Sequence, residues 1–436
     1  MRFRVRPARR LTGHAEVPGD KSVSHRAVLL GALAEGVSEV HGFLEAEDCL
    51  RTITAVQAMG AEVTRKGPGH YRIAGGGLRG LSEPGDVVDC GNSGTTARLL
   101  AGVLAGQPFW TLMTGDGSLR RRPMGRIAEP LRGMGATIVG RADGTRLPLA
   151  VRGTATPRAI EYLTPVASAQ IKSAVLLAGL GADGPVTVIE PAPSRDHSER
   201  MLRRFGARLT TAECAVTLTP GPLTATSVTV PGDISSAAFL LVAGAVVPDA
   251  HVVLERVGIN PTRTGILDVL AAMGARITAG ATTDEGEPTA SLTVTGGPLR
   301  GTAIAGARLL PRLIDEVPVL AVAAAVASGV TEVRDATELR VKESDRIAAI
   351  ARELGKMGAR IDERPDGMAI AGGHRLHGAE VTSGGDHRMA MALTIAALVA
   401  DGETVIADTA CVSTSFPQFT ETINALVGSP VVTVEE

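Results

Sequence analysis

The stretch VPGDKSVSHRAVLL, Val17–Leu30, returns in altered form as VPGDISSAAFLLVA at Val230–Ala243. In both copies a Pro-Gly-Asp turn precedes an apolar helix, and Asp is a favoured residue at a helix start. The match divides the chain into two similar halves. We therefore predict two domains, residues 1–20 plus 234–436 and residues 21–233, with the chain crossing between them near Asp20 and again near Asp233.

A shorter motif repeats within the halves. A helical pattern ends at a Met-Gly or Phe-Gly pair and an apolar strand follows, at intervals of roughly 70–85 residues. The copies lie at Met59, Met134, Phe205, Met273 and Met357, with a degenerate copy from Ala425. Six apolar helices rich in small residues lie between these motifs, which gives three units per half. Helices that alternate with short strands predict a mixed α/β (α+β) class.

Composition excludes several classes of protein. Of the 436 residues, 44% are hydrophobic but only 2% are aromatic, so the core consists mainly of Ala, Val, Leu and Ile. The net charge of −2 offers no basic excess for a nucleic-acid backbone. The four cysteines lie far apart and form no zinc motif. The basic N-terminus lacks an apolar signal segment, and no apolar run is long enough to span a membrane. We expect a cytoplasmic protein without a metal, nucleic-acid or membrane partner.

Polar and charged residues gather where the six apolar helices begin. They are Lys21, Ser22 and Arg26; Asn92, Ser93, Gly94, Thr95 and Arg98; Ser168, Gln170 and Lys172; Asp233; Asp315; and Asp386, His387 and Arg388. Cations oppose the positive end of a helix dipole, whereas an anion there is stabilised. If the repeated units pack with pseudo-symmetry, these helix starts form an anion-binding site. The alternative is that they are solvated helix ends with scattered charges.

Three other charged segments are open to the same two interpretations. GDGSLRRRPMGR contains Arg120, Arg121, Arg122 and Arg126; ELRVKESDRIAAI contains Lys342, Glu343 and Arg346; PSRDHSERML contains Arg195, Asp196 and His197. Charge runs of this kind are usually solvated.

Seven motifs in order resemble the 5-enolpyruvylshikimate-3-phosphate synthase family over nearly the whole chain: PGDKSVSHR, GNSGTTAR, RRPMGR, SAQIKSAVLLAG, IDEVP, RVKESDR and DHRMAM. The strings SAQIKSAVLLAGL, PSRDHSERML and NPTRTGIL resemble its class II branch. The resemblance implies two domains of three βαβαββ units each, with the active site between them. It also implies transfer of the enolpyruvyl group of phosphoenolpyruvate to the 5-hydroxyl of shikimate 3-phosphate, with release of phosphate. Both substrates are anions, and no cofactor is implied.

The resemblance further assigns individual residues. Those implied to contact shikimate 3-phosphate are Lys21, Ser22, Arg26, Ser168, Ala169, Gln170, Arg195, Asp315 and Lys342. Those implied to contact phosphoenolpyruvate are Lys21, Gly94, Arg122, Gln170, Arg346 and Arg388. In the chemistry, Asp315 is the implied base for the 5-hydroxyl, Glu343 the proton donor to the methylene carbon and later its acceptor, and Lys21 a stabiliser of charge.

The chain departs from the family pattern at two places. Thr414 in CVSTSFP stands where many relatives carry Lys near phosphoenolpyruvate, and Glu338 stands where others carry Asn. The family is inhibited by glyphosate at the phosphoenolpyruvate site. Gly94 is the residue of sensitive relatives, while class II relatives are often tolerant, so the two signals conflict.

Two other functions share the expected scaffold. The sister enzyme acting on UDP-N-acetylglucosamine typically has a reactive Cys in the loop that corresponds to GDGSLRRRP, and this loop contains none. A non-catalytic binding protein is the other alternative, since fold alone does not determine function. We expect a monomeric enzyme.

Overall fold

The computed structural model describes residues 1–284 and 286–436. The chain forms two compact units. The inserted unit comprises Gly19–Val230 with Gly286 and Glu287, and the split unit comprises Met1–Pro18, Pro231–Asp284 and Pro288–Glu436. Each unit has its own apolar core.

In the described part of the chain, each unit contains three sheets of one topology: a parallel pair of strands followed by two antiparallel neighbours. The first sheet of the inserted unit has the strand order β14 (Leu223–Thr224), β3 (Ala34–His41), β5 (His70–Gly76), β4 (Glu62–Gly67), and β15 (Ser227–Thr229) also pairs with β3. The second has the order β6 (Val88–Asp89), β7 (Trp110–Thr114), β9 (Leu149–Arg152), β8 (Thr137–Gly140). The third has the order β10 (Glu161–Leu163), β11 (Val186–Ile189), β13 (Ala215–Thr219), β12 (Arg208–Thr211).

The first sheet of the split unit has the strand order β2 (Arg10–Glu16), β16 (Asp249–Gly258), β19 (Pro288–Thr295), β17 (Arg276–Ala279), and β18 (Thr283–Asp284) also pairs with β19. The second has the order β20 (Ala303–Ile304), β21 (Val330–Val333), β23 (Gly367–Ala371), β22 (Arg360–Arg364). The third has the order β24 (Glu380–Thr382), β25 (Thr404–Ala407), β1 (Arg2–Val5), β26 (Val432–Glu435). The recurrence of one strand order confirms the predicted α/β class and the predicted repeats.

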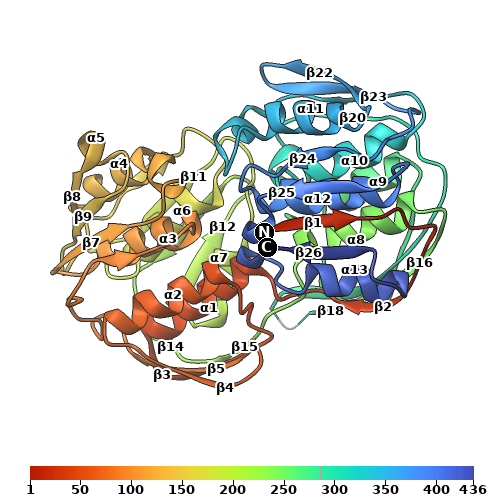
Figure 1. Ribbon diagram of the computed structural model, residues 1–436. Coiled ribbons are helices and arrows are strands. Elements are labelled where there is room, and N and C mark those ends of the chain that lie inside the picture. Colours follow the sequence, from red (N-terminus) through yellow and green to blue (C-terminus); the bar gives the residue numbers. More distant parts are fainter. Residues whose placement is uncertain (285) are drawn as a thin grey trace. The chain divides into compact units, whose positions relative to one another are not determined.

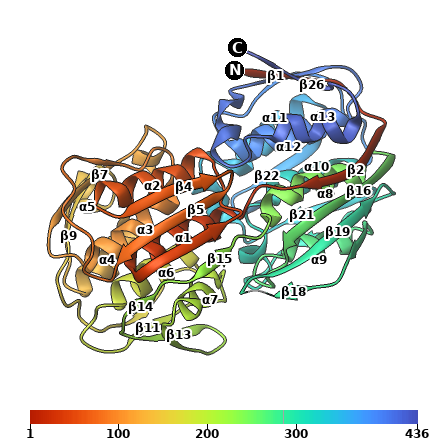
Figure 2. The same ribbon diagram turned by 90° about the horizontal axis from the view of Figure 1, so that it is seen from below.

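The N-terminal strands complete two sheets of the split unit. Figure 1 shows β1, in red, beside the blue C-terminal strands, and the register pairs Arg2 with both Ala407 and Glu435. Figure 2 shows β2 beside β16, and here Arg10 pairs with Asp249 in a parallel ladder. The first 16 residues therefore fold with the C-terminal half of the sequence.

Six inner helices carry the candidate residues at their starts: α1 (Lys21–Leu33), α3 (Gly94–Ala105), α6 (Ala169–Gly179), α8 (Ile234–Val246), α10 (Val317–Val326) and α12 (His387–Leu398). They are buried almost all round, as their small apolar residues predict. Close packing explains the small residues: a Cβ on Gly102 of α3 would lie 2.3 Å from the carbonyl oxygen of Ala174 in α6. Only glycine permits this approach.

The outer helices are α2 (Glu47–Ala58), α4 (Gly125–Gly133), α7 (His197–Arg204), α9 (Gly265–Ala272), α11 (Arg346–Lys356) and α13 (Phe419–Val427). In the first five copies the Met or Phe of the repeated motif follows the helix and is fully buried, with 0% exposure. The next glycine has a positive φ, as it does at Gly428 after α13. The motif is thus a helix end in which an apolar anchor precedes a left-handed glycine.

Candidate active site

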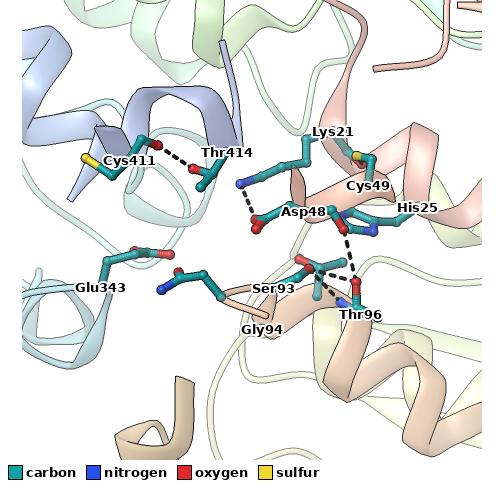
Figure 3. Close-up of polar contacts among 12 residues, drawn as sticks. Lys21, His25, Asp48, Cys49, Ser93, Gly94, Thr96, Glu343, Cys411 and Thr414 are labelled. Carbon is teal, nitrogen blue, oxygen red and sulfur yellow. Dashed lines mark hydrogen bonds and ion pairs between the residues drawn. The ribbon is translucent and has the colours of Figure 1, made fainter. Parts of the chain in front are cut away.

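The start of α1 explains in part how two cations are tolerated there. Asp20 caps the helix, since its Oδ1 accepts a hydrogen bond from the Val23 amide at 2.9 Å. Lys21 extends to Asp48 on α2, with 3.0 Å between Nζ and Oδ2 (Figure 3). The Lys21 side chain is still 18% exposed. An acidic partner on the next helix therefore offsets part of the cost that the helix dipole imposes.

Arg26 lies one turn further into α1 and is only 5% exposed. Its guanidinium donates to Ser198 Oγ at 2.7 Å, Ser173 Oγ at 2.7 Å and the Ser22 carbonyl oxygen at 2.9 Å. These contacts use three of the five guanidinium N–H groups. Burial lowers the pKa of Arg26 to about 10, and the nearby Glu199 carboxylate limits this fall. Arg26 is therefore a charged group held in place mainly by neutral oxygens.

Hydrogen bonds join the starts of α3 and α6. The Gln170 amide donates to Thr95 Oγ1 at 3.1 Å and accepts from Arg98 Nη1 at 2.9 Å. Arg98 also donates to the Pro123 carbonyl oxygen at 3.0 Å. Gln170, expected to contact both substrates, thus has a fixed orientation. Arg98 was seen in the sequence as part of the helix start, but the family resemblance did not single it out.

The arginine run contains one buried member. Arg122 is 8% exposed, while Arg120 and Arg121 are exposed. Arg122 follows the short helix η1 (Leu119–Arg121) and donates to Asn92 Oδ1 at 2.8 Å. Buried arginines need such partners. Arg120 and Arg121 agree with the solvated interpretation, and Arg122 does not.

Gly94 lies between two guanidinium groups. A Cβ built on it would lie 2.7 Å from Arg98 Nη1 and 3.2 Å from Arg122 Nη1. The preceding Ser93 caps α3 by accepting from the Thr96 amide at 3.1 Å (Figure 3). The absent side chain at Gly94 therefore allows two cationic groups to reach the positive end of a helix, an arrangement that favours an anionic ligand.

In the split unit, Arg346 is the centre of a cluster of carboxylates. It begins α11 and is 1% exposed. Its nitrogens lie 3.2 Å from Asp315 Oδ1, 2.7 Å from Glu343 Oε2 and 2.9 Å from Asp386 Oδ2. Burial alone would lower the pKa of Arg346, but the carboxylates outweigh it and the pKa is raised. Arg346 is therefore a permanent cation that connects the two carboxylates expected to carry the chemistry.

The three carboxylates around Arg346 differ in exposure. The Asp386 side chain is fully buried, caps α12 through the Arg388 amide at 3.0 Å, and keeps a lowered pKa because Arg346 outweighs the effect of burial. The Asp315 and Glu343 side chains remain 14% and 19% exposed. Asp386 is thus a structural partner, whereas the Asp315 and Glu343 side chains keep some exposure to solvent. The sequence suggested Asp386 only as part of a helix start.

Lys342 and Arg388 both lie near Asp315. Lys342 Nζ is 3.4 Å from Asp315 Oδ1, and Arg388 donates to the Asp315 carbonyl oxygen at 3.1 Å. Arg388 Nη1 also lies 3.6 Å from Glu316 Oε1. The split unit therefore brings together the five candidates Asp315, Lys342, Glu343, Arg346 and Arg388.

The remaining candidates lie on the inserted unit, and Thr414, the departure from the family pattern, lies on the split unit. Ser168 precedes α6, with its amide donating to Glu190 Oε1 at 3.0 Å, and Ala169 is the first residue of that helix. Ser22 and Arg195 are half-buried. Thr414 donates through Oγ1 to the Cys411 carbonyl oxygen at 2.7 Å and is 9% exposed (Figure 3). The missing Lys at position 414 is therefore replaced by a neutral hydroxyl that is bonded to its own loop.

Within the described residues, no group of three or more His, Cys, Asp and Glu side chains could hold a metal ion. Among the same residues, no helix has the length and apolar character needed to cross a membrane.

Comparison with known proteins first identifies the class of fold. The chain matches the enolpyruvyl transferase NikO from Streptomyces tendae with a TM-score of 0.77 at 19% identity, over 98% of this chain and 97% of that one. It matches EPSP synthase from Acinetobacter baumannii with a TM-score of 0.88 and 44% identity, over 100% of both chains.

Sequence comparison then identifies the family. Residues 5–423 match the EPSP synthase (3-phosphoshikimate 1-carboxyvinyltransferase) family. A 3-phosphoshikimate 1-carboxyvinyltransferase from Gloeobacter violaceus is 57% identical over 422 residues, 96% of this chain and 97% of that protein. One from Desulforudis audaxviator is 53% identical, over 98% of this chain and 99% of that protein. The chain belongs to the EPSP synthase family of enzymes, which confirms the resemblance found in the sequence and does not favour the sugar-nucleotide alternative.

Proposed function

We propose that this chain transfers the enolpyruvyl group of phosphoenolpyruvate to the 5-hydroxyl of shikimate 3-phosphate and releases inorganic phosphate, a step in the synthesis of aromatic amino acids. The family membership supports this reaction. The observation that carries it is the cluster at Arg346, which holds two partly exposed carboxylates beside one buried cation. An addition followed by an elimination needs two such proton-transfer groups.

Anion binding falls chiefly to the inserted unit. Lys21, Ser22, Arg26, Arg195 and the Ser168–Gln170 segment bind shikimate 3-phosphate. Lys21, Gly94, Arg122 and Gln170 bind phosphoenolpyruvate, together with Arg346 and Arg388 of the split unit. The helix starts and the buried or half-buried cations support this assignment, because charge-assisted hydrogen bonds to phosphate are strong.

The chemistry falls to the split unit. Asp315 takes the proton of the 5-hydroxyl as its oxygen bonds to carbon 2 of phosphoenolpyruvate, while Glu343 delivers a proton to carbon 3. In the second step Glu343 removes a proton from the new methyl group, the carbon–oxygen bond to phosphate breaks, and Asp315 returns its proton to the leaving phosphate. Lys21 stabilises the charge on that phosphate, and Lys342 orients the ring hydroxyls together with Asp315. Both carboxylates regain their starting protonation, so the cycle balances.

The two domains that we propose, residues 1–20 with 234–436 and residues 21–233, each supply part of the site. In this proposal the enzyme acts as a monomer in the cytoplasm without a metal or cofactor, and glyphosate competes for the phosphoenolpyruvate site.

The test is release of inorganic phosphate from phosphoenolpyruvate with one of two acceptors, shikimate 3-phosphate or UDP-N-acetylglucosamine. The proposal predicts release with the first acceptor only, and its loss in Asp315→Asn. Release with the sugar nucleotide would support the sister activity. Binding of shikimate 3-phosphate without any phosphate release would support a non-catalytic binding protein.

A further inference from the structure

A buried ion cluster beneath the inserted unit's helix starts has no role in the reaction described above. It joins Lys172 on α6, Glu190 just after β11 and Glu199 on α7. Lys172 Nζ lies 2.8 Å from Glu190 Oε2 and 2.8 Å from Glu199 Oε1. The three residues are only 4%, 5% and 5% exposed. We call these three residues the Lys172 triad.

Such a triad is costly as a purely stabilising feature. Buried ion pairs often contribute no more to stability than apolar residues of the same volume, because the charges lose their hydration. Burial alone would lower the pKa of Lys172, but the two carboxylates outweigh it and raise that pKa, so the ammonium stays charged. Glu199 Oε2 has no hydrogen-bond partner among the described residues, which adds to the cost.

The triad contacts the candidate substrate residues from two sides. Glu190 uses its second oxygen, Oε1, to accept from the Ser168 amide at 3.0 Å. Glu199 adjoins Ser198, whose Oγ accepts from Arg26 Nε at 2.7 Å. The Glu199 carboxylate also raises the pKa of Arg26 against the effect of burial.

Arg26 adds a second cation beside the two carboxylates of the triad, and Asp20, Arg195 and Glu287 also act on its charge. The Ser173 hydroxyl closes the arrangement: it lies 2.6 Å from Ser198 Oγ, accepts from Arg26 at 2.7 Å and donates to the Ala169 carbonyl oxygen. The start of α6 and the guanidinium of Arg26 therefore belong to one connected buried network.

We propose that Lys172, Glu190 and Glu199 are positioning residues for shikimate 3-phosphate: they fix the Ser168 segment and the charged Arg26 in their ligand-binding geometry before the substrate arrives. This inference rests on the proposed function, because it takes Ser168 and Arg26 as substrate contacts. Fixing these groups in advance removes an ordering cost from binding. The effect should fall mainly on shikimate 3-phosphate, because the triad's contacts among the described residues go to Ser168 and none of them reaches Arg122 or the Arg346 cluster.

The test is Glu190→Gln, which keeps the side-chain volume but places an uncharged amide beside Lys172. We expect the KM for shikimate 3-phosphate to rise roughly tenfold, the value of one charge-assisted hydrogen bond, with the KM for phosphoenolpyruvate unchanged within twofold. In calorimetric titrations, affinity for shikimate 3-phosphate should fall and affinity for unphosphorylated shikimate should change much less, because Ser168 serves the phosphate.

The split unit offers a matched control. Glu353 on α11 is also fully buried, accepts from a backbone amide, that of Thr382, at 3.0 Å, and pairs with Lys356 at 2.8 Å. Its hydrogen-bond partners among the described residues are Arg352, Lys356 and Thr382, none of which is a candidate substrate residue. Glu353→Gln should lower the melting temperature by an amount similar to Glu190→Gln and leave both KM values unchanged.

If Glu190→Gln does not fold, Glu199→Gln carries the test, with the same expected split between the two KM values. Equal changes in both KM values, or an effect of Glu353→Gln equal to that of Glu190→Gln, would overturn the proposal and leave the triad a structural element. Failure of the proposed function itself would be distinct, because the wild-type protein would then show no turnover of shikimate 3-phosphate.

Discussion

The starts of the inner helices in the two units use charge in opposite ways. In the inserted unit the residues assigned to substrate binding include cations but no carboxylate. Arg26 and Arg122 donate to neutral oxygens of Ser and Asn, and Lys21 pairs with one carboxylate, that of Asp48. In the split unit the candidate cation Arg346 contacts three carboxylates. A cation that donates to neutral groups adds positive charge where an anion is proposed to bind, whereas a cation among carboxylates connects the groups proposed to transfer protons. In the function that we propose, one repeated scaffold thus supplies an anion-binding half and a proton-transfer half.

The largest expected effect lies in the proton-transfer half. Asp315→Asn removes the proposed base but keeps its shape, so turnover should fall by roughly 10²–10⁴. Binding of shikimate 3-phosphate, measured by calorimetry, should change by less than about threefold, because the amide keeps the shape of the carboxylate and most of the proposed phosphate contacts lie on the inserted unit. Turnover within threefold of wild type would remove Asp315 from this role.

The next effect lies in the anion-binding half. Arg122→Ala deletes a buried cation, and we expect the KM for phosphoenolpyruvate to rise by about 10–100-fold, the value of hydrogen bonds to a charged group. Steady-state kinetics with each substrate varied in turn would measure this. The exposed Arg120, changed in the same way, should leave both KM values unchanged. Equal results for the two variants would show that Arg122, like Arg120, belongs to a solvated charged surface and does not bind phosphoenolpyruvate.

Gly94→Ala should have an intermediate effect. The new methyl group would meet Arg98 at 2.7 Å and Arg122 at 3.2 Å. Both contacts are with the ends of flexible side chains, so the guanidinium groups move at a cost of about 1–3 kcal/mol. The KM for phosphoenolpyruvate should therefore rise as well, and the binding of glyphosate should weaken more than the binding of phosphoenolpyruvate. Equal inhibition constants for both proteins, or a wild type that resists millimolar-scale glyphosate, would exclude Gly94 as the determinant.

The smallest effect concerns pH and stability. His25 is fully buried in the inserted unit, bonded to Thr52 at 2.6 Å, and burial, helped by Lys21 and Arg26, lowers its pKa well below 6.5. Between pH 7.5 and 5.5 the unfolded chain binds a proton that the folded chain does not, so the free energy of unfolding should fall by about 1.4 kcal/mol.

Denaturant titrations at the two pH values would measure this loss, and His25→Asn should abolish it. Asp386 in the split unit gives the contrast. Its pKa is lowered, because Arg346 outweighs burial, so its contribution is present above the ordinary aspartate range and is lost only as pH falls below about 4. A loss in His25→Asn equal to that of wild type would contradict this account.

Much of the fold could be predicted because it repeats. The Met-Gly and Phe-Gly pairs marked helix ends, and the small-residue helices marked the core, since both are local signals. The contacts that support the site could not be predicted in this way. Asp48, which offsets Lys21, lies on another helix, and nothing in the sequence distinguishes it from Glu47. The partners of Arg26 come from α6 and α7, and only folding brings these residues together.

The arginine run shows the same limit. Sequence alone could not separate Arg122 from Arg120 and Arg121, because the difference lies in burial and in the contact with Asn92. The KESDR motif suggested a charged helix start, but it did not reveal that Arg346 would be fully enclosed or that Asp386 would complete its partners.

The division between the two halves is tested most directly by solvent-deuterium incorporation at the methylene carbon of phosphoenolpyruvate, followed by NMR in D₂O with shikimate 3-phosphate present. Proton delivery to that carbon and its later removal should exchange the methylene hydrogens in wild type. In Glu343→Gln the exchange should fall by roughly 10²-fold or more, with shikimate 3-phosphate still bound at near wild-type affinity. Exchange at the wild-type rate in Glu343→Gln would contradict the assignment of proton transfer to the carboxylates around Arg346.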